Sequence, residues 1–212
     1  MDLKLNGKRA LVTGGSKGIG KSISELLKKE GVDVTVLSRT EGLKIDVLTD
    51  NLSSVPNNFD ILINNVGGGG TWGSEEYESF NEWDEVYKKN AGVATKLTMK
   101  CLPYMKKKKW GRVITISSMY GKESGGKPWF VMAKSAEIAL MKSLSGKYEG
   151  ITFNTIAPGY IDVGKDFGNI SEKAKIGSPE DVANLVVFLC SDKANFINGA
   201  CISIDGGESK SF

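Results

Sequence analysis

Thr13-Gly14-Gly15-Ser16-Lys17-Gly18-Ile19-Gly20 is the stretch of this 212-residue chain that decides the fold. It lies between an apolar, strand-like run over Arg9 to Thr13 and a run from Ile19 to Glu30 whose apolar residues recur at helical spacing. Glycines allow a tight turn and a close approach to a bound phosphate, and the free N–H groups of a helix N-terminus attract an anion. The stretch therefore predicts a dinucleotide-binding turn between a first strand and a first helix.

The rest of the chain alternates between strand-like and helix-like patterns. This alternation predicts one α/β domain over residues 1–212, a doubly wound Rossmann fold whose parallel sheet is covered by helices on both faces. Ser178-Pro179 has the residues of a helix start, with Ser as N-cap and Pro at the first helical position. Further strands are expected at Val32 to Leu37, Asp60 to Asn64, Arg112 to Ser117, Ile151 to Ile156 and Ala200 to Ile204, and long helices from about Asn81 to Lys107 and from about Trp129 to Tyr148.

Composition excludes several classes of function. The chain contains no histidine, which removes Ser-His-Asp and Cys-His catalysis and histidine metal sites. Its three cysteines have neither metal-like nor redox-like spacing, so no metal is expected and the cysteines are interpreted as small apolar residues in a reducing compartment. A formal charge of +3 gives no support for nucleic-acid binding, and neither a signal peptide nor a bilayer-spanning run is seen. We therefore expect a cytoplasmic protein without a membrane partner.

The glycine turn also satisfies a second pattern. Gly15, Gly20, Lys21 and Ser22 read as G-x-x-x-x-G-K-S, the phosphate-binding loop of nucleoside triphosphatases. Such an enzyme needs a second strand that ends in an aspartate beside the magnesium ion. The predicted strand at Asp60 to Asn64 ends in asparagines instead. The triphosphatase is therefore the weaker interpretation of the turn.

Basic residues near the end of the second strand bear on the choice of cofactor. A dinucleotide fold places an acid there to bind the ribose 2′-OH of NAD, or an arginine to accommodate the 2′-phosphate of NADP. Here Ser38-Arg39 follows the strand without an acid, and Lys17 lies in the nearby glycine turn. Two cations around one extra phosphate predict NADP(H), with ordinary surface cations as the alternative.

Motifs further along the chain extend this pattern in a fixed order. Asp46-Val47 is followed by Asn64-Asn65-Val66-Gly67, then by Pro158-Gly159 and by a terminal Asp205-Gly206-Gly207. Together with the TGxxxGxG spacing of the glycine turn, they resemble the adenine-side pair, the NNAG motif, the nicotinamide-side loop and the DGG of classical short-chain dehydrogenases/reductases. The resemblance covers nearly the whole chain. It implies NADP(H)-dependent hydride transfer to or from a small carbonyl or alcohol substrate.

The resemblance also implies which residues contact the cofactor and how the chain assembles. It implies a homodimer or homotetramer in which the two long helices form subunit interfaces. The implied cofactor contacts are Gly14, Ser16, Lys17, Gly18, Ile19, Gly20, Ser38, Arg39, Asp46, Val47, Asn65, Val66, Gly67, Lys134, Pro158, Gly159 and Ile161.

The resemblance assigns the catalytic positions to Asn90, Ser118, Phe130 and Lys134. In the family, the Ser holds the carbonyl and a Tyr one helical turn before the Lys donates the proton. The Lys lowers the pKa of that Tyr and binds the nicotinamide ribose. In this chain the Tyr position holds Phe130, whose ring can neither give nor take a proton. The usual Ser-to-Tyr spacing would select Ser117, whereas the preceding strand favours Ser118.

Phe130 leaves three explanations open. The chain can be a catalytically silenced NADP(H)-binding scaffold or sensor, because general acid catalysis is worth about 10²–10⁴-fold. It can instead use a substitute proton donor, which would be Tyr120, Tyr160, or a water held by Ser118 and Lys134. The third explanation is a misaligned motif, although no Tyr stands four residues before any other lysine of this region.

Overall fold

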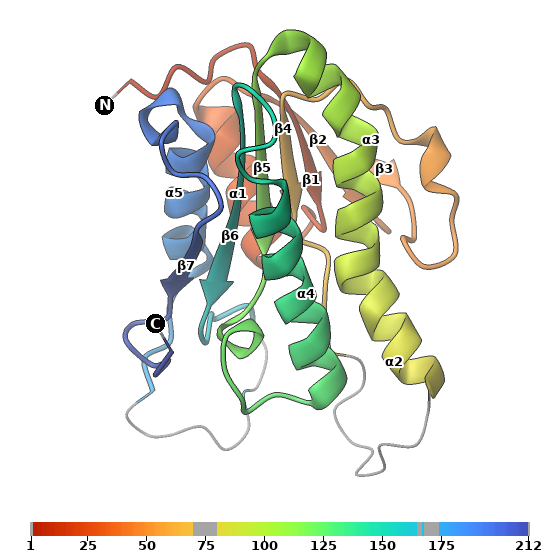
Figure 1. Cartoon of the computed structure of the whole chain (residues 1–212), viewed down its shortest axis with the longest axis vertical. Helices are drawn as coiled ribbons and strands as arrows, with labels where there is room; N and C mark the ends of the chain where they lie inside the picture. Colours follow the sequence, from red (N-terminus) through yellow and green to blue (C-terminus); the bar gives the residue numbers. More distant parts are fainter. Residues whose placement is uncertain (1, 70–79, 165–166, 168–173, 212) are drawn as a thin grey trace.

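Seven parallel strands form the centre of the computed structural model, which describes residues 2–69, 80–164, 167 and 174–211 (Figure 1). The strand order is β3-β2-β1-β4-β5-β6-β7, and it reverses between β1 and β4. Dinucleotides bind at such a reversal, outside the carboxyl ends of the strands. The strands are β1 (Arg9–Thr13), β2 (Asp33–Ser38), β3 (Leu43–Lys44), β4 (Ile61–Asn64), β5 (Gly111–Ile116), β6 (Ile151–Pro158) and β7 (Cys201–Ile204).

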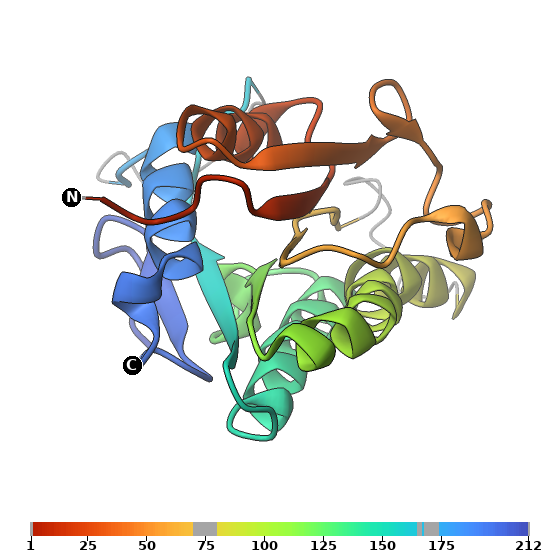
Figure 2. The same ribbon diagram turned by 90° about the horizontal axis from the view of Figure 1, so that it is seen from above.

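Helices cover both faces of this sheet, which confirms the predicted doubly wound fold. Figure 2 shows α1 and α5 on one face and α2, α3 and α4 on the other. Their bounds are α1 (Gly18–Lys29), α2 (Phe80–Tyr87), α3 (Val93–Lys108), α4 (Pro128–Leu144) and α5 (Pro179–Cys190), with a π-helical turn η2 (Lys88–Gly92) and 3₁₀ turns η1 (Leu52–Ser54), η3 (Met119–Gly121) and η4 (Asp192–Ala194).

Successive residues of a strand serve opposite faces of the sheet. In β1, Ala10 and Val12 belong to the apolar cluster under α1 and α5, whereas Leu11 belongs to the cluster under α3 and α4. In β5, Ile114 and Val113 divide in the same way. Both faces of β1 and β5 are therefore buried, which explains why these two strands read as continuous apolar runs.

The helix boundaries follow the sequence signals with two exceptions, the first being that α4 ends at Leu144 and not near Tyr148. Ser178 caps α5: its hydroxyl accepts from the Asp181 N–H at 3.2 Å, and the Asp181 carboxylate accepts from the Ser178 N–H at 2.7 Å. The predicted helix from Asn81 to Lys107 is not one regular α-helix. The turn η2 interrupts it between α2 and α3, around Asn90. A π-helical turn of this kind is frequent at functional sites.

Candidate functional site

The end of β1 and the end of β4 are tied together beside the reversal of strand order. The Thr13 hydroxyl donates to the Ile63 carbonyl at 3.2 Å and accepts from the N–H groups of Asn65 and Val66. The Asn65 amide donates to the carbonyls of Thr13 at 2.9 Å and Gly14 at 3.3 Å. These bonds bring three predicted cofactor residues, Gly14, Asn65 and Val66, to one place.

The glycine turn that follows β1 requires glycine at several points. Gly14 has φ of 66° and Gly18 has φ of 53°, in the left-handed region that favours glycine. A Cβ on Gly20 would lie 2.3 Å from the Gly14 carbonyl oxygen. Ser16 and Lys17 form the tip of the turn, where Lys17 is exposed.

The start of α1 suits an anionic ligand. Within the described residues, no side chain caps this N-terminus and no acid lies in its first turn. Its N–H groups and the positive end of its dipole are therefore open to a negative charge. The glycine-lined turn and the open helix start together fit the pyrophosphate of a dinucleotide. Ile19, another predicted cofactor residue, packs partly against the core cluster under α1.

The loop after β6 lies beside the glycine turn. Pro158 ends β6, the Gly159 N–H donates to β7 at 3.1 Å, and Ile161 is buried. A Cβ on Gly18 would lie 3.1 Å from a methyl carbon of Val163. The predicted nicotinamide-side residues and the predicted phosphate turn therefore belong to one site.

A compact turn after β2 carries the predicted adenosine-side residues. The Ser38 hydroxyl donates to the Glu41 carbonyl at 2.9 Å and accepts from the N–H groups of Thr40 and Glu41. Ser38 thus shapes the turn with its side chain, while Arg39 is exposed at its tip. After β3, one oxygen of Asp46 accepts from the Leu48 N–H at 3.0 Å. Val47 packs against the core cluster under α3 and α4.

The geometry gives no support to the triphosphatase alternative. Lys21 lies within α1, where its ammonium pairs with Glu25 at 3.8 Å on the exposed surface of the helix. A phosphate-binding lysine would instead have to direct its ammonium toward a phosphate held in the glycine turn.

Lys134 lies at the centre of the second half of the site. Its side chain is almost fully buried, and its Nζ donates to the Ile116 carbonyl at 2.9 Å and to Glu137 Oε2 at 3.0 Å. A Cβ on Gly67 would lie 2.9 Å from this Nζ and 2.5 Å from Asn90 Oδ1. The structure therefore brings the predicted residues Gly67, Asn90 and Lys134 together.

Asn90 is fully buried in the π-helical turn. Its Nδ2 donates to the carbonyls of Val86 at 2.7 Å and Gly68 at 3.0 Å, and its Oδ1 accepts from the Gly68 N–H at 3.2 Å. Asn90 thus holds the backbone that follows the Asn64-Asn65-Val66-Gly67 motif against α4.

The two candidate serines differ in what their hydroxyls do. Ser117 is buried and donates to the Lys134 carbonyl at 2.9 Å, so its hydroxyl supports α4. Ser118 is half-buried and accepts from the Tyr120 N–H at 3.2 Å. Within the described residues its own hydrogen has no acceptor. This favours Ser118 as the hydroxyl that can serve a substrate.

Phe130 occupies the position expected for a proton donor. A Cβ on Gly69 would lie 3.5 Å from the Phe130 ring, and the ring centroid lies 5.8 Å from Lys134 Nζ. The side chain is thus one turn before Lys134 and beside the backbone that Asn90 fixes. It offers the ammonium only the face of a π-system.

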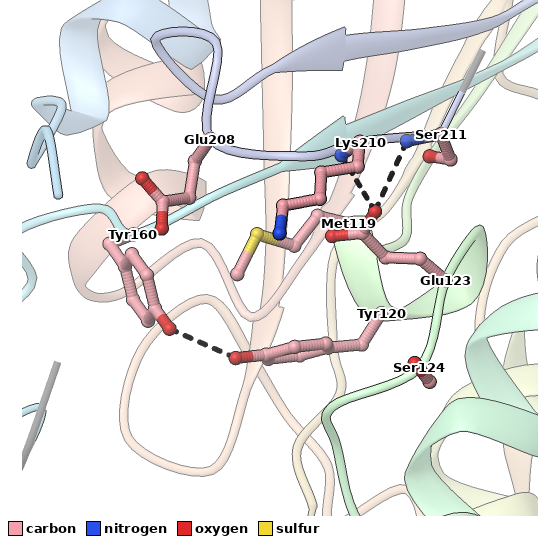
Figure 3. A pocket seen from close by; sticks show the side chains of 8 residues that line it. All are labelled: Met119, Tyr120, Glu123, Ser124, Tyr160, Glu208, Lys210 and Ser211. Atoms are coloured by element: carbon pink, nitrogen blue, oxygen red, sulfur yellow. Dashed lines mark hydrogen bonds between the residues drawn. The ribbon is translucent and has the colours of Figure 1, made fainter. Parts of the chain in front are cut away.

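A cleft of about 480 Å³ opens beside η3, the turn that Ser118 precedes in the chain (Figure 3). In it the hydroxyls of Tyr120 and Tyr160, the two candidate substitute donors, form a 3.0 Å hydrogen bond. Burial and then this bond raise the pKa of Tyr120 to about 12, which makes it a weaker acid than a free phenol. The cleft is lined by Met119, Tyr120, Glu123, Ser124, Tyr160, Glu208, Lys210 and Ser211.

Two features of the site were not predicted. Glu123 holds the C-terminal segment against the cleft, because its carboxylate accepts from the N–H groups of Lys210 at 2.9 Å and Ser211 at 3.2 Å. Glu137 pairs with Lys134 inside α4. The sequence carried one signal for Glu137, which is a charge four residues after the buried Ala133 on an otherwise apolar helix face.

Comparisons with known sequences agree with this geometry. The profile of the family described as "Enoyl-(Acyl carrier protein) reductase" matches residues 44–209, and the one described as "short chain dehydrogenase" matches residues 8–58. The 3-oxoacyl-(acyl-carrier-protein) reductase FabG of Aquifex aeolicus is 30% identical over 250 aligned residues, which cover 98% of this chain and 99% of the relative.

Solved structures show the same fold. L-sorbose reductase from Gluconobacter frateurii, complexed with NADPH and L-sorbose, has a TM-score of 0.88 and 25% identity, with 100% of both chains covered. Aldohexose dehydrogenase from Thermoplasma acidophilum, in ligand-free form, has a TM-score of 0.83 and 29% identity over 97% of this chain and 95% of that chain. Among the residues described here, moreover, every helix is too short or too polar to cross a bilayer.

Proposed function

The chain belongs to the short-chain dehydrogenase/reductase family of oxidoreductases, and from this premise we propose that it binds NADP(H) and uses it on the carbonyl or alcohol group of a small molecule. The observation that carries the proposal is the position of Lys134, which is buried, doubly anchored and beside Gly67 at the reversal of strand order. We further propose that Phe130 impairs the proton-transfer half of the reaction.

Three groups of side chains would hold the cofactor. The glycine turn and the start of α1 suit its pyrophosphate, and the exposed cations Arg39 and Lys17 suit a 2′-phosphate. Asp46 and Val47 follow β3 on the adenosine side. Lys134 has three ammonium hydrogens, of which two are used within the described residues, so one is left for a ribose hydroxyl beside Gly67. When bound, NADPH supplies the hydride.

Carbonyl reduction also needs a proton at the substrate oxygen. Among the described residues no acceptor takes the Ser118 hydroxyl hydrogen, so this hydrogen can orient the substrate oxygen. Tyr120 is a poor donor, because its pKa is raised to about 12 and its hydroxyl is bonded to that of Tyr160. The remaining substitute is a water held by Ser118 and Lys134, which would share the third Lys134 hydrogen with the ribose hydroxyl. Because a positioned acid is worth about 10²–10⁴-fold, we expect slow turnover.

Phe130 also favours a second candidate function, that of a catalytically silenced NADP(H)-binding scaffold or sensor. Both candidates need the same cofactor half of the site, and they differ only in turnover. The cleft beside η3 has hydroxyl and carboxylate groups in its lining, which suits a polar substrate. Turnover of any carbonyl compound in that cleft would favour the enzyme.

Assembly is a further part of the proposal. We propose a homodimer or homotetramer with α2, α3 and α4 at the interfaces, as in the family. Exposed apolar side chains support this: Tyr87 on α2 is 43% exposed, Met99 on α3 is 43% exposed and Met132 on α4 is 42% exposed.

Cofactor titration and turnover test the proposed function together. The fluorescence of the reduced nicotinamide ring should change when the nucleotide binds to the protein. NADPH is expected to bind more tightly than NADH in this titration, and Arg39→Asp is expected to abolish or reverse this preference. Lys29→Asp is the matched control, because it makes the same charge change at the far end of α1. Turnover is then measured as NADPH oxidation with a panel of aldehydes, ketones and keto-sugars. Equal affinity for both nucleotides in the native protein would contradict the cofactor assignment.

A further inference from the structure

Glu137 occupies a buried position on α4 where an apolar residue would be expected. Ala133, Glu137 and Met141 are spaced by four residues, all three are at most 1% exposed, and they form one face of the helix. A lone carboxylate in such surroundings is strongly disfavoured. Glu137 therefore needs a partner, and the partner is Lys134, one turn earlier on the same helix at 3.0 Å.

The pair sets the direction of the Lys134 ammonium. One hydrogen is bound by the Ile116 carbonyl at the end of β5 and a second by Glu137. A tetrahedral ammonium held at two points has its third hydrogen fixed. Gly67 lies next to Nζ, and a Cβ on it would come within 2.9 Å of Nζ, so the lack of a side chain at Gly67 leaves the space beside Nζ open. Phe130 offers no oxygen to this ammonium, since its ring is a hydrocarbon whose centroid is 5.8 Å from Nζ.

The charge on Glu137 depends on Lys134 alone among the described residues. Burial raises the pKa of Glu137 to about 7, and Lys134 is the one group that opposes this shift. Of the elements packed against α4, β6 carries no ionisable side chain. The ionisable side chains on the others are Tyr120 on η3, Arg112 on β5, Lys88 and Lys89 on η2, and Glu82, Asp84, Glu85 and Tyr87 on α2.

We propose that Glu137 is a positioning residue of the cofactor site, whose carboxylate holds the Lys134 ammonium directed at the space beside Gly67. The inference rests on the proposed function in so far as that space holds the nicotinamide ribose. A role in stability alone does not account for the pair, because apolar side chains of similar volume are often as stabilising as a buried ion pair. In this chain Glu137 is the anionic partner of Lys134. Phe130 has no oxygen with which to bind the ammonium.

The first test compares NADPH affinity at about pH 6 and about pH 9. Near pH 6 the Glu137 carboxyl is largely protonated, because its pKa is about 7, so Glu137→Gln should bind NADPH as the native protein does. Near pH 9 the variant should bind about tenfold more weakly, the value of one charge-assisted hydrogen bond, since the Lys134 ammonium then lacks the carboxylate that fixes its direction. Equal weakening at both pH values would mean structural damage only and would overturn the proposal, as would no weakening at either.

Two further variants serve as controls in this titration. Glu149→Gln breaks a Lys–Glu pair of similar length, 2.8 Å to Lys109, on the exposed surface, and it should match the native protein at both pH values. Glu137→Asp retains the charge with a side chain one methylene shorter. It should retain more of the affinity near pH 9 than Glu137→Gln does, and an Asp variant as weak as the Gln variant would contradict a role for the charge.

A second measurement needs no cofactor. Glutamate labelled with ¹³C at Cδ reports the charge of each carboxyl by NMR, and the Glu137 resonance is identified by its loss in Glu137→Gln. In the native protein without nucleotide, this resonance should titrate near pH 7, because burial raises the pKa of Glu137 to about 7 while Lys134 opposes the rise. In Lys134→Met it should titrate at a higher pH, since the opposing charge is gone. If the native Glu137 carboxyl stays protonated up to about pH 9, the proposal fails, even if the variants do not fold. A native protein that binds no NADPH would instead refute the proposed function.

Discussion

Replacing Phe130 with Tyr is expected to raise the rate of carbonyl reduction by about 10²–10⁴-fold, because it restores a positioned acid. The new hydroxyl would lie on the same face of α4 as Lys134, one turn away, since residues four apart are neighbours on a helix. The backbone around Gly69 and Asn90 already packs beside the ring, so the substitution adds one oxygen atom to an existing position. Cofactor affinity should change little.

The distance from Lys134 sets the acidity of the new hydroxyl. The ring centroid lies 5.8 Å from Nζ. At an effective dielectric constant of about 20, a unit charge at that separation stabilises a phenolate by about 3 kcal/mol, or about 2 pKa units. This would lower the pKa of the new Tyr from about 10 to about 8. The Glu137 carboxylate on the same ammonium opposes the effect, so about 2 units is an upper bound.

The assay follows NADPH oxidation with a carbonyl panel for both proteins as a function of pH. Phe188→Tyr is the matched control, because Phe188 is a half-buried phenylalanine on α5, across the sheet from the site. In the Phe130→Tyr protein, reduction should decline as pH rises through the lowered pKa, since the protonated phenol is the donor. If the native protein is as fast as this variant on its best substrate, a substitute donor exists and the impairment argument is refuted.

Three other predictions concern separate parts of the molecule. ATP with magnesium should bind weakly or not at all, because Lys21 pairs with Glu25 on the surface of α1, and ATP hydrolysis that Lys21→Ala abolishes would contradict this. Ser118→Ala should reduce any turnover while leaving the melting temperature nearly unchanged. Ser117→Ala should mainly lower the melting temperature, since the Ser117 hydroxyl donates to the Lys134 carbonyl. The reverse pattern would exchange the roles of the two serines. Because the pKa of Glu137 is raised from 4.5 to about 7, its contribution to stability is present below 4.5 and is lost as pH rises to about 7. Urea unfolding should therefore show up to about 3 kcal/mol of stability lost over that range, and the same slope in Glu137→Gln would argue against it.

The local pattern of the sequence determined the architecture. Apolar runs, helical spacing and the cap at Ser178 predicted the doubly wound sheet, and the glycine turn predicted where β1 passes into α1. These features depend on residues close together in the chain, so that periodicity and turn chemistry report them. The match of motifs from Thr13 to Asp205 also predicted which residues meet, as Gly67, Asn90 and Lys134 do.

Tertiary structure alone decided what several of those residues do. A two-residue strand such as β3 has no period to detect, and it forms because the Ser38 turn returns the chain to the edge of β2. The bond from Ser117 to the Lys134 carbonyl and the pair of Tyr120 with Tyr160 join residues that are 17 and 40 positions apart. Such contacts are set by how α4, η3 and the loop after β6 pack on the sheet. Burial then determines which charged groups interact, because it removes water from Glu137 and places Lys134 beside it.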